Sequence, residues 1–488
     1  MTANILVIDQ GTTSTRAILF GSAGRVVAEA RRTLRQVYPR PGWVEQDPDD
    51  IWSDTLSVIK EVSVGHTIAA IGIANQRETT IVWDRRTGRP VYNAIVWQDR
   101  RTADLCQDLV ERGYTELVAE RTGLVIDPYF SASKIAWLLD NVAGLRDRAL
   151  RGEVVFGTVD SYLIWRLTGG DSHLTDATNA ARTMLFDIHR CEWDDELLDL
   201  WRIPRQMLPE VRDSAGDFGR VQADVLRNTP PISGVAGDQH AATVGQACFE
   251  RGTMKSTYGT GAFLLLNTGD RPVRSTHRLI TTIAYRVDGK TAYALEGSIF
   301  NAGTTIQWLR DGLKIIEQSS DVEWLAMQSS EDSEVVIVPA FTGLGAPHWR
   351  ADALAAVFGL TRDTGRAELA RAALEAVVYQ TYDLLEAMRA DGAPAPTELR
   401  VDGGMVNNNL LAQLLADICG IAVIRPRNVE TTALGAAFLA SVGAGHHHSL
   451  AEVAGYWRPD RRFTPSMTPA LRDRKLARWS DAIRRLLA

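Results

Sequence analysis

Residues 5–20 read ILVIDQGTTSTRAILF, and the order of apolar and hydroxyl side chains in this stretch decides the fold. Two short apolar runs, 5–8 and 17–20, flank a turn that contains one glycine and several hydroxyl side chains. Apolar runs on either side of such a turn predict a β-hairpin. The turn presents backbone N–H and hydroxyl donors, which suit a phosphate. Asp9 could hold Mg²⁺ through water, and Arg16 could reach a phosphate oxygen.

A second stretch repeats this plan about half a chain later. Residues 253–267 read TMKSTYGTGAFLLLN, with a Gly-Thr-Gly tip between a mixed run and an apolar run. A third glycine turn follows at Gly403–Gly404. Two similar hairpins predict a fold duplicated in two domains. We place the boundary near residue 245, which gives domains 1–245 and 246–488, although no Pro-rich or Ser-rich linker marks it.

Strand and helix patterns alternate between and after the two hairpins. The apolar run 68–74 predicts a strand, and 160–167 predicts a helix with Asp160 as its N-cap. In the second half, 365–388 has apolar residues at helical spacing, and a further helix is expected over 408–419. This alternation predicts an α/β protein.

Length and composition are those of an ordinary globular protein. With 488 residues the chain exceeds the size at which one core stops growing, so at least two domains are expected. A net charge of −7 predicts no basic surface for nucleic acid. No run approaches the ~18 apolar residues of a membrane span, and the first residues lack a secretory signal pattern. Four cysteines without paired or metal-ligand spacing favour a reducing compartment, so we expect a cytoplasmic protein that acts on small molecules.

The familiar loops that bind nucleotide phosphates do not occur in this sequence. There is no GxxxxGK[ST] loop, and no GxGxxG follows a strand and opens a helix. Any phosphates would therefore be held by the paired hairpins. The run His446–His448 predicts a solvent-exposed segment and no metal site, because three adjacent residues cannot all face one ion from a helix.

Five motifs occur in a fixed order along the chain, and they are DQGTTS at 9–14, NQRETT at 75–80, GDQ at 237–239, YGTG at 258–261 and VDGG at 401–404. Together they resemble the glycerol kinase family, a branch of the carbohydrate kinases built on the actin-like ATPase fold. The resemblance extends from residue 4 to about residue 445. The first hairpin is shared with xylulose and gluconate kinases, whereas the segments at 75–83 and 41–48 look specific to the glycerol branch.

The resemblance implies two actin-like (ribonuclease H-like) α/β domains with a catalytic cleft between them. The domain 1–245 would bind glycerol, and the domain 246–488 would bind the nucleotide. The activity would be ATP-dependent and Mg²⁺-dependent phosphorylation of glycerol to sn-glycerol 3-phosphate. The enzyme would assemble as a homodimer or homotetramer.

Carried over residue by residue, the resemblance assigns the parts of the site, with Asp238 as the catalytic base. The glycerol-binding set is Arg77, Glu78, Tyr129, Asp238 and Gln239, with Trp97 and Phe263 packed on the carbon chain. The ATP-binding set is Thr12, Thr13, Ser14, Arg16, Thr260, Gly303, Gln307, Gly404 and Asn408. Asp9 and Asp238 would hold Mg²⁺ through water, and His240 would lie behind the site.

Other interpretations of the same residues stay open at this stage. Without the resemblance, Arg77–Glu78 is an ordinary surface salt pair and Asp238 is a helix N-cap. Trp97 and Tyr129 are ordinary core residues. At the level of function, the alternatives are a kinase for another small polyol or sugar, and an actin-like nucleotide switch that phosphorylates no small molecule.

Overall fold

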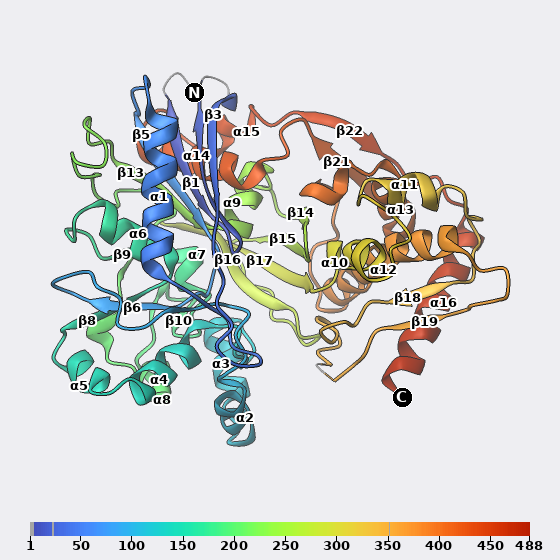
Figure 1. The fold of residues 1–488 in the computed structure, drawn as a ribbon, viewed down its shortest axis with the longest axis horizontal. Helices are drawn as coiled ribbons and strands as arrows, with labels where there is room; N and C mark the ends of the chain where they lie inside the picture. Colours follow the sequence, from blue (N-terminus) through green and yellow to red (C-terminus); the bar gives the residue numbers. More distant parts are fainter. Residues whose placement is uncertain (1–3, 22–23, 351) are drawn as a thin grey trace.

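The computed structural model describes residues 4–21, 24–350 and 352–488 (Figure 1). Two mixed β-sheets flanked by helices confirm the predicted α/β class. The first sheet has the order β13-β5-β1-β2-β3, and the second has the order β16-β17-β15-β14-β20-β21-β22. Their strands are β1 (Ile5–Gln10), β2 (Ser14–Phe20), β3 (Val26–Thr33), β5 (Ala70–Asn75) and β13 (Ile232–Gly237), then β14 (Thr253–Tyr258), β15 (Ala262–Gly269), β16 (Ile280–Val287), β17 (Lys290–Ile299), β20 (Glu398–Asp402), β21 (Ala422–Pro426) and β22 (Pro459–Phe463).

The two sheets share one topology. In the first, β1 and β2 form the predicted antiparallel hairpin, β5 runs parallel to β1, and β13 runs parallel to β5. In the second, β14 and β15 form the predicted hairpin, β20 runs parallel to β14, and β21 runs parallel to β20. A third antiparallel strand completes each set, β3 beside β2 and β17 beside β15. The similar hairpins in the sequence therefore correspond to a repeated arrangement of strands.

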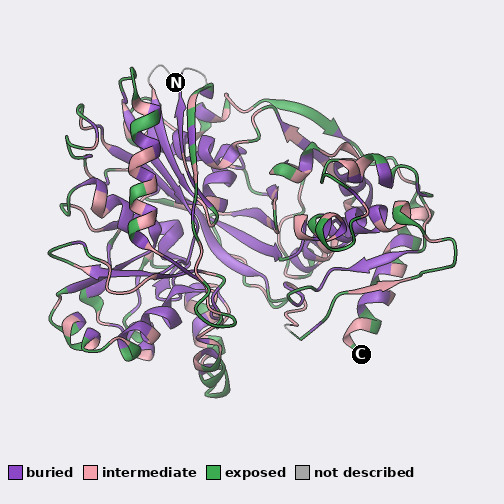
Figure 2. Ribbon diagram, in the orientation of Figure 1, coloured by how far each residue is buried: buried purple, intermediate pink, exposed green. Residues whose placement is uncertain are grey.

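The central strand β1 is buried on both faces, which explains its uninterrupted apolar sequence. Leu6 and Ile8 pack into a core with helices α1 (Pro48–Ser63) and α6 (Val159–Leu167). Ile5 and Val7 face the other way, into a core with α14 (Thr431–Gly443). A helix from the second half of the chain thus covers the sheet formed by its beginning (Figure 1). The central strands of both sheets are buried, whereas the edge strands β3 and β22 are largely exposed (Figure 2).

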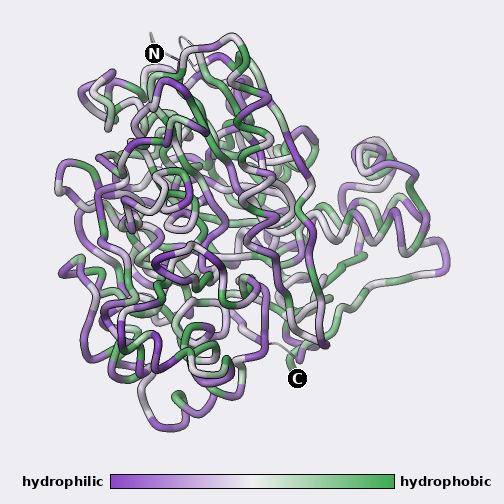
Figure 3. The backbone as a smooth tube through the Cα atoms, turned by 60° about the vertical axis from the view of Figure 1, so that its left-hand side comes forward, coloured by the Kyte–Doolittle hydropathy of each residue, from purple (hydrophilic) through white to green (hydrophobic). Residues whose placement is uncertain are grey.

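Much of the stretch 81–212 forms smaller units below the first sheet (Figure 1). Hydrophilic residues predominate in the peripheral loops of the molecule (Figure 3). These units are β6 (Ile81–Asp84) with β8 (Val154–Gly157), β9 (Leu174–Asp176) with β12 (Glu210–Arg212), β10 (Phe186–Asp187) with β11 (Glu192–Trp193), and helices α2 (Ala103–Glu111), α3 (Thr115–Thr122), α4 (Ser131–Asn141), α5 (Leu145–Leu150), α7 (Ala177–Ala180) and α8 (Asp195–Trp201). The short pair β4 (Glu45–Gln46) and β7 (Ala94–Ile95) links them to the first hairpin region.

The second sheet carries its own helices. The long α12 (Arg366–Ala390) matches the helix expected from the apolar spacing, and α13 (Asn409–Cys419) begins one residue later than expected, with Asn408 as its N-cap. The remaining elements here are α10 (Gly303–Gln307), α11 (Asp321–Ala326), β18 (Val336–Val338) with β19 (Ala356–Phe358), and α16 (Pro469–Leu487). The short α15 (Leu450–Ala454) packs instead with α14 in the core on the first sheet. Within the described ranges, no helix is both long and apolar enough to cross a membrane.

Two local expectations were wrong. Thr158 is the N-cap of α6, and Asp160 instead lies buried in the first turn, where it accepts hydrogen bonds from the hydroxyls of Thr158 and Thr175. In the run His446–His448, the first and last residues are exposed as predicted, but His447 is buried: its ring contacts Tyr456, and its Nδ1 lies 2.6 Å from Ser441 Oγ. The burial of His447 follows from the end of α14 folding back on α15, which local sequence does not encode.

Helices α9 (Asp238–Gly245) and α14 cross at glycines, backbone to backbone. A Cβ at Gly435 would lie 1.7 Å from the carbonyl oxygen of Ala241, and a Cβ at Gly245 would lie 1.9 Å from the carbonyl oxygen of Thr431. No side chain fits at that separation. Because α9 begins at Asp238, this contact also fixes the helix that carries two candidate site residues.

We predict that Gly435→Ala lowers the free energy of unfolding by about 3 kcal/mol, the upper end of typical overpacking costs, because the helices must separate to admit the methyl group. Urea unfolding followed by circular dichroism measures the change. Gly216→Ala is the control, since an added Cβ there would come no closer than 3.7 Å to Asp213 O. Equal stability of the two variants would contradict the tight crossing.

Candidate active site

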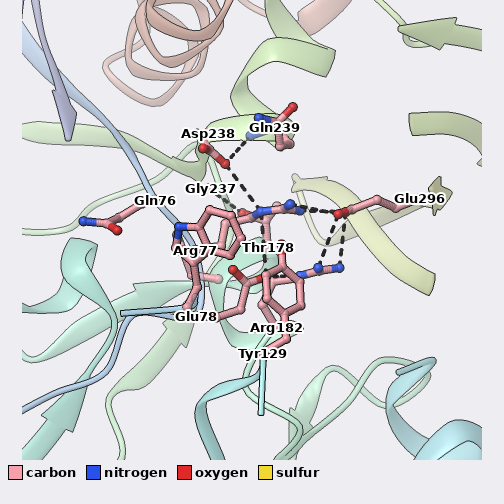
Figure 4. A network of polar contacts seen from close by, with 12 residues as sticks. Gln76, Arg77, Glu78, Tyr129, Thr178, Arg182, Gly237, Asp238, Gln239 and Glu296 are labelled. Atoms are coloured by element: carbon pink, nitrogen blue, oxygen red, sulfur yellow. Dashed lines mark hydrogen bonds and ion pairs between the residues drawn. The ribbon is translucent and has the colours of Figure 1, made fainter. Parts of the chain in front are cut away.

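A chain of buried charges lies where the two sheets meet (Figure 4). Arg77 follows β5, and its Nη1 and Nη2 donate to Glu296 Oε2 and Oε1 at 2.6 and 2.8 Å. Arg182 follows α7. Its own Nη1 and Nη2 donate to the same Glu296 oxygens, Oε2 and Oε1, at 3.2 and 3.3 Å. Its Nε donates to Glu78 Oε1 at 2.6 Å. One carboxylate from β17 therefore holds two guanidinium groups from the first half of the chain.

The sequence alternative of a surface salt pair at Arg77–Glu78 is wrong, because both side chains are buried and their Nε–Oε1 separation is 3.9 Å. Their strong partners are Glu296 and Arg182 instead. Burial raises the pKa of Glu296, but the guanidinium groups of Arg182 and Arg77 outweigh it and hold that pKa well below its ordinary value.

Glu78 adopts a left-handed backbone conformation with φ of 60°, which is unfavourable for a residue with a Cβ. Its carbonyl oxygen accepts hydrogen bonds from the hydroxyls of Ser131 and Thr80 at 3.0 and 3.2 Å. Its carboxylate is held by Arg182. Strained residues of this kind persist only where the surroundings over-determine them, and they concentrate at functional sites.

Asp238 is the partly exposed member of this group of charges. It is the first residue of α9, directly after β13, and Gly237 rather than Asp238 is the N-cap, so the N-cap alternative is wrong. Its Oδ1 accepts from the backbone N–H of Gln239 at 2.7 Å and lies 3.4 Å from Arg77 Nε. Its side chain is 30% exposed, against 2% for Arg77. Burial raises the pKa of Asp238 to about 6, although the Arg77 guanidinium opposes the shift.

Neighbouring side chains fix the turn that carries Asp238. Lys255, buried on β14, donates to Gln239 Oε1 and to Thr257 Oγ1. Burial lowers the pKa of Lys255 to about 8. The backbone N–H of Gly237 donates to Thr178 Oγ1 at 3.0 Å. The turn is therefore held from both halves of the chain.

His240 lies behind Asp238, as expected. It is fully buried, and burial together with nearby cations holds its pKa well below the ordinary value. A neutral imidazole in this position adds no charge to the group. The carboxylates of Glu78, Asp238 and Glu296 then compensate the cations of Arg77, Arg182 and Lys255, and the buried Asp402 also lies near Lys255.

An aromatic wall stands beside the charges. Trp97 and Tyr129 meet edge to face with ring centroids 5.4 Å apart, and both are partly exposed rather than core residues. Trp97 Nε1 donates to Thr12 Oγ1 at 2.9 Å, which joins the wall to the tip of the first hairpin. The loop of Tyr129 is held by Lys134, whose ammonium donates to the carbonyl oxygens of residues 128, 129 and 130. Phe263, the other residue assigned to the carbon chain, is half-buried on β15.

The first hairpin tip is closed by a hydrogen bond from Gly11 N to Ser14 O, and Thr13 is exposed there. Arg16 pairs with Asp9 at 2.5 Å and with Glu430 at 2.7 Å. The two charged residues assigned to phosphate and metal therefore bind each other in this structure. Among the described residues, no group of three or more His, Cys, Asp or Glu side chains is arranged around a metal site.

The glycine tips of the second half pack closely. The backbone N–H of Gly303 donates to Gly259 O at 3.0 Å, and a Cβ at Gly303 would lie 2.5 Å from that oxygen. A Cβ at Gly404, in contrast, would meet nothing within 4 Å. Asn408 caps α13 by accepting from Leu411 N at 2.8 Å, and Thr260 and Gln307 are exposed.

Sequence reasoning missed Arg182, Glu296, Lys255 and Thr178. Lys255 and Glu296 are charged residues within strands that are otherwise mostly uncharged. A charged residue in such a strand is seldom buried without a partner, and this signal could have singled out both residues. Arg182 and Thr178 follow no comparable pattern.

Both halves of the chain match the models of a known protein family. Residues 4–245 match the N-terminal domain of the FGGY family of carbohydrate kinases, and residues 254–444 match its C-terminal domain. A solved structure of a xylulose kinase from Lactobacillus acidophilus superposes with a TM-score of 0.90 at 24% identity, over 99% of this chain and 98% of that one, which shows the shared fold. The chain belongs to the FGGY family of carbohydrate kinases.

More similar relatives narrow its place within the family. Glycerol kinases from Cereibacter sphaeroides and Alteromonas mediterranea are 59% and 56% identical to it, over 100% of this chain and 100% and 99% of theirs. The solved Plasmodium falciparum glycerol kinase with ADP matches with a TM-score of 0.94 at 37% identity, over 99% of this chain and 98% of that one. The resemblance to the glycerol kinase family, drawn from the motifs, is confirmed.

Proposed function

We propose that this chain transfers the γ-phosphate of ATP to a terminal hydroxyl of glycerol and so forms sn-glycerol 3-phosphate. One observation carries the proposal beyond family membership. A partly exposed carboxylate, Asp238, lies against the buried Arg77 where the two sheets meet. Polar groups and the Trp97–Tyr129 wall surround it. This is a site for a small molecule with several hydroxyl groups and a short apolar edge.

The polar set suits glycerol. Arg77 has five N–H donors, and two of them bind Glu296, so others can reach a hydroxyl group. Glu78, Tyr129 and Gln239 supply further donors and acceptors, while Trp97 and Phe263 pack on the carbon chain. Discrimination follows because a ligand that lacks a matching hydroxyl leaves buried polar groups unpaired.

Asp238 serves as the general base in this mechanism. Phosphoryl transfer depends first on positioning and charge stabilisation, and a carboxylate then accepts the hydroxyl proton as the new bond forms. The raised pKa of about 6 leaves Asp238 ionised at neutral pH and makes it a better proton acceptor than an ordinary aspartate. Arg77, at 3.4 Å, orients the carboxylate and limits the shift.

The two hairpin tips hold the phosphates through their backbone N–H groups and hydroxyls. Thr12, Thr13 and Ser14 contribute from the first and Thr260 from the second, while Gly303, at the start of α10, packs on the second tip through its hydrogen bond to Gly259 O. Mg²⁺ binds through a few carboxylates, water and substrate phosphates, so a site without a three-carboxylate cluster fits it. Asp238 and Asp9 would hold the ion through water, and Arg16 would reach a phosphate oxygen. The ion would supply neutralisation of phosphate charge.

The adenosine lies over Gly404, with Gln307 and Asn408 beside it. The open space above Gly404 supports this assignment. The domain 1–245 thus contributes most of the glycerol site and the domain 246–488 most of the nucleotide site. We place the enzyme in the cytoplasm as a homodimer or homotetramer. The four cysteines, all free thiols, support a reducing compartment.

The direct test is release of ADP from ATP on addition of glycerol, with the position of the phosphate read by ³¹P and ¹³C NMR. If another polyol or sugar is turned over faster than glycerol, that compound replaces glycerol as the proposed substrate. ATP-dependent polymerisation in sedimentation, without a phosphorylated product, would favour an actin-like nucleotide switch.

We predict that Asp238→Asn lowers turnover about 10²–10⁴-fold, the usual contribution of a general base, while ATP affinity stays nearly unchanged. The amide keeps the shape and the acceptor for Gln239 N–H but takes up no proton. Turnover and nucleotide affinity are measured together. Asp217→Asn is the control, because Asp217 also accepts from a backbone N–H, that of Gly219, in an exposed loop. Near-normal turnover of Asp238→Asn would remove Asp238 from the chemistry.

We predict that Gly404→Leu raises the KM for ATP about tenfold or more and changes the KM for glycerol little, since it removes nucleotide binding alone. The free energy of unfolding stays close to that of the wild type, because a Cβ there meets no atom within 4 Å. Gly404→Ala gives a smaller effect, and Gly216→Leu is the matched loop control. An unchanged KM for ATP would place the adenosine elsewhere.

A further inference from the structure

Two residues proposed to bind glycerol, Arg77 and Glu78, are held in place by other buried residues. Arg77 and Glu78 are adjacent in the chain, yet their charged groups are 3.9 Å apart at the closest. Each binds instead to a residue that nothing in the motifs singled out, Arg77 to Glu296 and Glu78 to Arg182. Arg182 and Glu296 also bind each other. The contacts form a continuous chain from Glu78 to Asp238 through Arg182, Glu296 and Arg77.

The geometry of this chain restricts Arg77 strongly. Two parallel N–H···O bonds to a carboxylate define the plane of a guanidinium as well as its position. With Nη1 and Nη2 on Glu296, the Nε of Arg77 points to Asp238 at 3.4 Å. The stem of Arg77 passes over Gly237, where a Cβ would lie 2.6 Å from Arg77 Cγ. Arg77 therefore has one orientation, and Glu296 sets it.

Glu296 itself is rigidly placed. It lies in the middle of β17, opposite Leu265 on β15 and Ile280 on β16, and it is fully buried. β15 also carries Phe263, which lies opposite Ser298 on β17. The carboxylate thus belongs to the same sheet surface as a residue assigned to the carbon chain of glycerol.

We infer that Glu296 and Arg182 are positioning residues for the polyol site, through which the second sheet holds Arg77 and Glu78 of the first half in their binding geometry. Neither residue touches the substrate. Glu296 orients Arg77 by its two-pronged hydrogen bonds, and Arg182 joins Glu296 to Glu78. This inference rests on the proposed function and adds two residues to the determinants of glycerol binding.

A positioning role for Glu296 predicts other effects of its removal than the role of an ordinary buried ion-pair partner. A purely structural carboxylate would affect stability when removed, and both substrates would bind normally to the folded fraction. A positioning carboxylate affects the substrate whose ligand it orients. Its effect also becomes smaller once that ligand is gone, because the effects of contacting residues in one network are not additive.

The test is a double-mutant cycle between Arg77 and Glu296. We expect Glu296→Gln to raise the KM for glycerol about tenfold or more while the KM for ATP changes less than about threefold, because orientation is lost at one substrate only. Arg77→Ala raises the KM for glycerol as well. The double variant then raises the KM for glycerol clearly less than the two single effects combined, since Glu296 acts in part through Arg77.

Two further variants keep the test decisive. Glu296→Asp keeps the charge but is one methylene shorter, so its KM for glycerol falls between those of the wild type and Glu296→Gln, and it carries the test if Glu296→Gln fails to fold. Glu375→Gln is the matched control. Glu375 is also a buried carboxylate held by two cations, Arg371 and Lys475, at 2.9 Å each, on α12 away from the site. We expect the variant Glu375→Gln to leave the KM for glycerol unchanged.

The outcomes distinguish the inference from the proposed function. Wild-type protein that neither binds glycerol in calorimetry nor phosphorylates it overturns both. With an active wild type, the inference fails alone if the Glu296 variants keep a normal KM for glycerol, raise both KM values equally, or add their effect in full to that of Arg77→Ala. An effect of Glu375→Gln on glycerol equal to that of Glu296→Gln also overturns it.

Discussion

The carboxylate of Glu296, held between the guanidinium groups of Arg77 and Arg182, is the contact on which the candidate site depends. It joins a strand of the second sheet to two loops of the first half without any exposure to solvent. Removing one partner from such a group leaves an uncompensated buried charge, which typically costs about 3–5 kcal/mol. The arrangement is therefore either complete or absent, and the orientation of Arg77 follows from it.

The balance of charge explains how one carboxylate can remain available for chemistry. Three cations lie among the carboxylates of Glu78, Asp238 and Glu296, and the buried Asp402 also lies near Lys255, while the buried His240 is neutral, so the cations are compensated by nearby carboxylates. Within this balanced set only Asp238 retains appreciable exposure, at 30% of its side chain. Burial raises its pKa while Arg77 restrains the rise. The result is a carboxylate that is ionised near neutral pH, accessible to a small molecule and fixed in direction.

Around this centre the fold uses backbone contacts where side chains would not fit. The crossing of α9 and α14 at Gly245 and Gly435 brings the last part of the chain against the first sheet and fixes the start of α9, where Asp238 lies. The glycine tips near residues 259 and 303 pack in the same way in the second half. Glycine therefore serves two purposes here, close packing of the framework and open space at Gly404.

Local patterns in the sequence predicted the two hairpins, the α/β class and the long helix α12, because each depends on residues near one another in the chain. The proposed roles of Arg77, Glu78 and Asp238 came instead from the family resemblance of the motifs that contain them. The partners of those residues depend on contacts across long separations. Arg77 and Glu296 are 219 positions apart, and Glu78 and Arg182 are 104 apart. The burial of His447 and the cap of α6 at Thr158 were likewise decided by neighbouring segments. The sequence by itself thus determined the motifs that contain the groups proposed to perform the chemistry. The tertiary structure alone decided which buried charges orient them, since pairing in a low-dielectric interior requires partners that only the folded chain brings together.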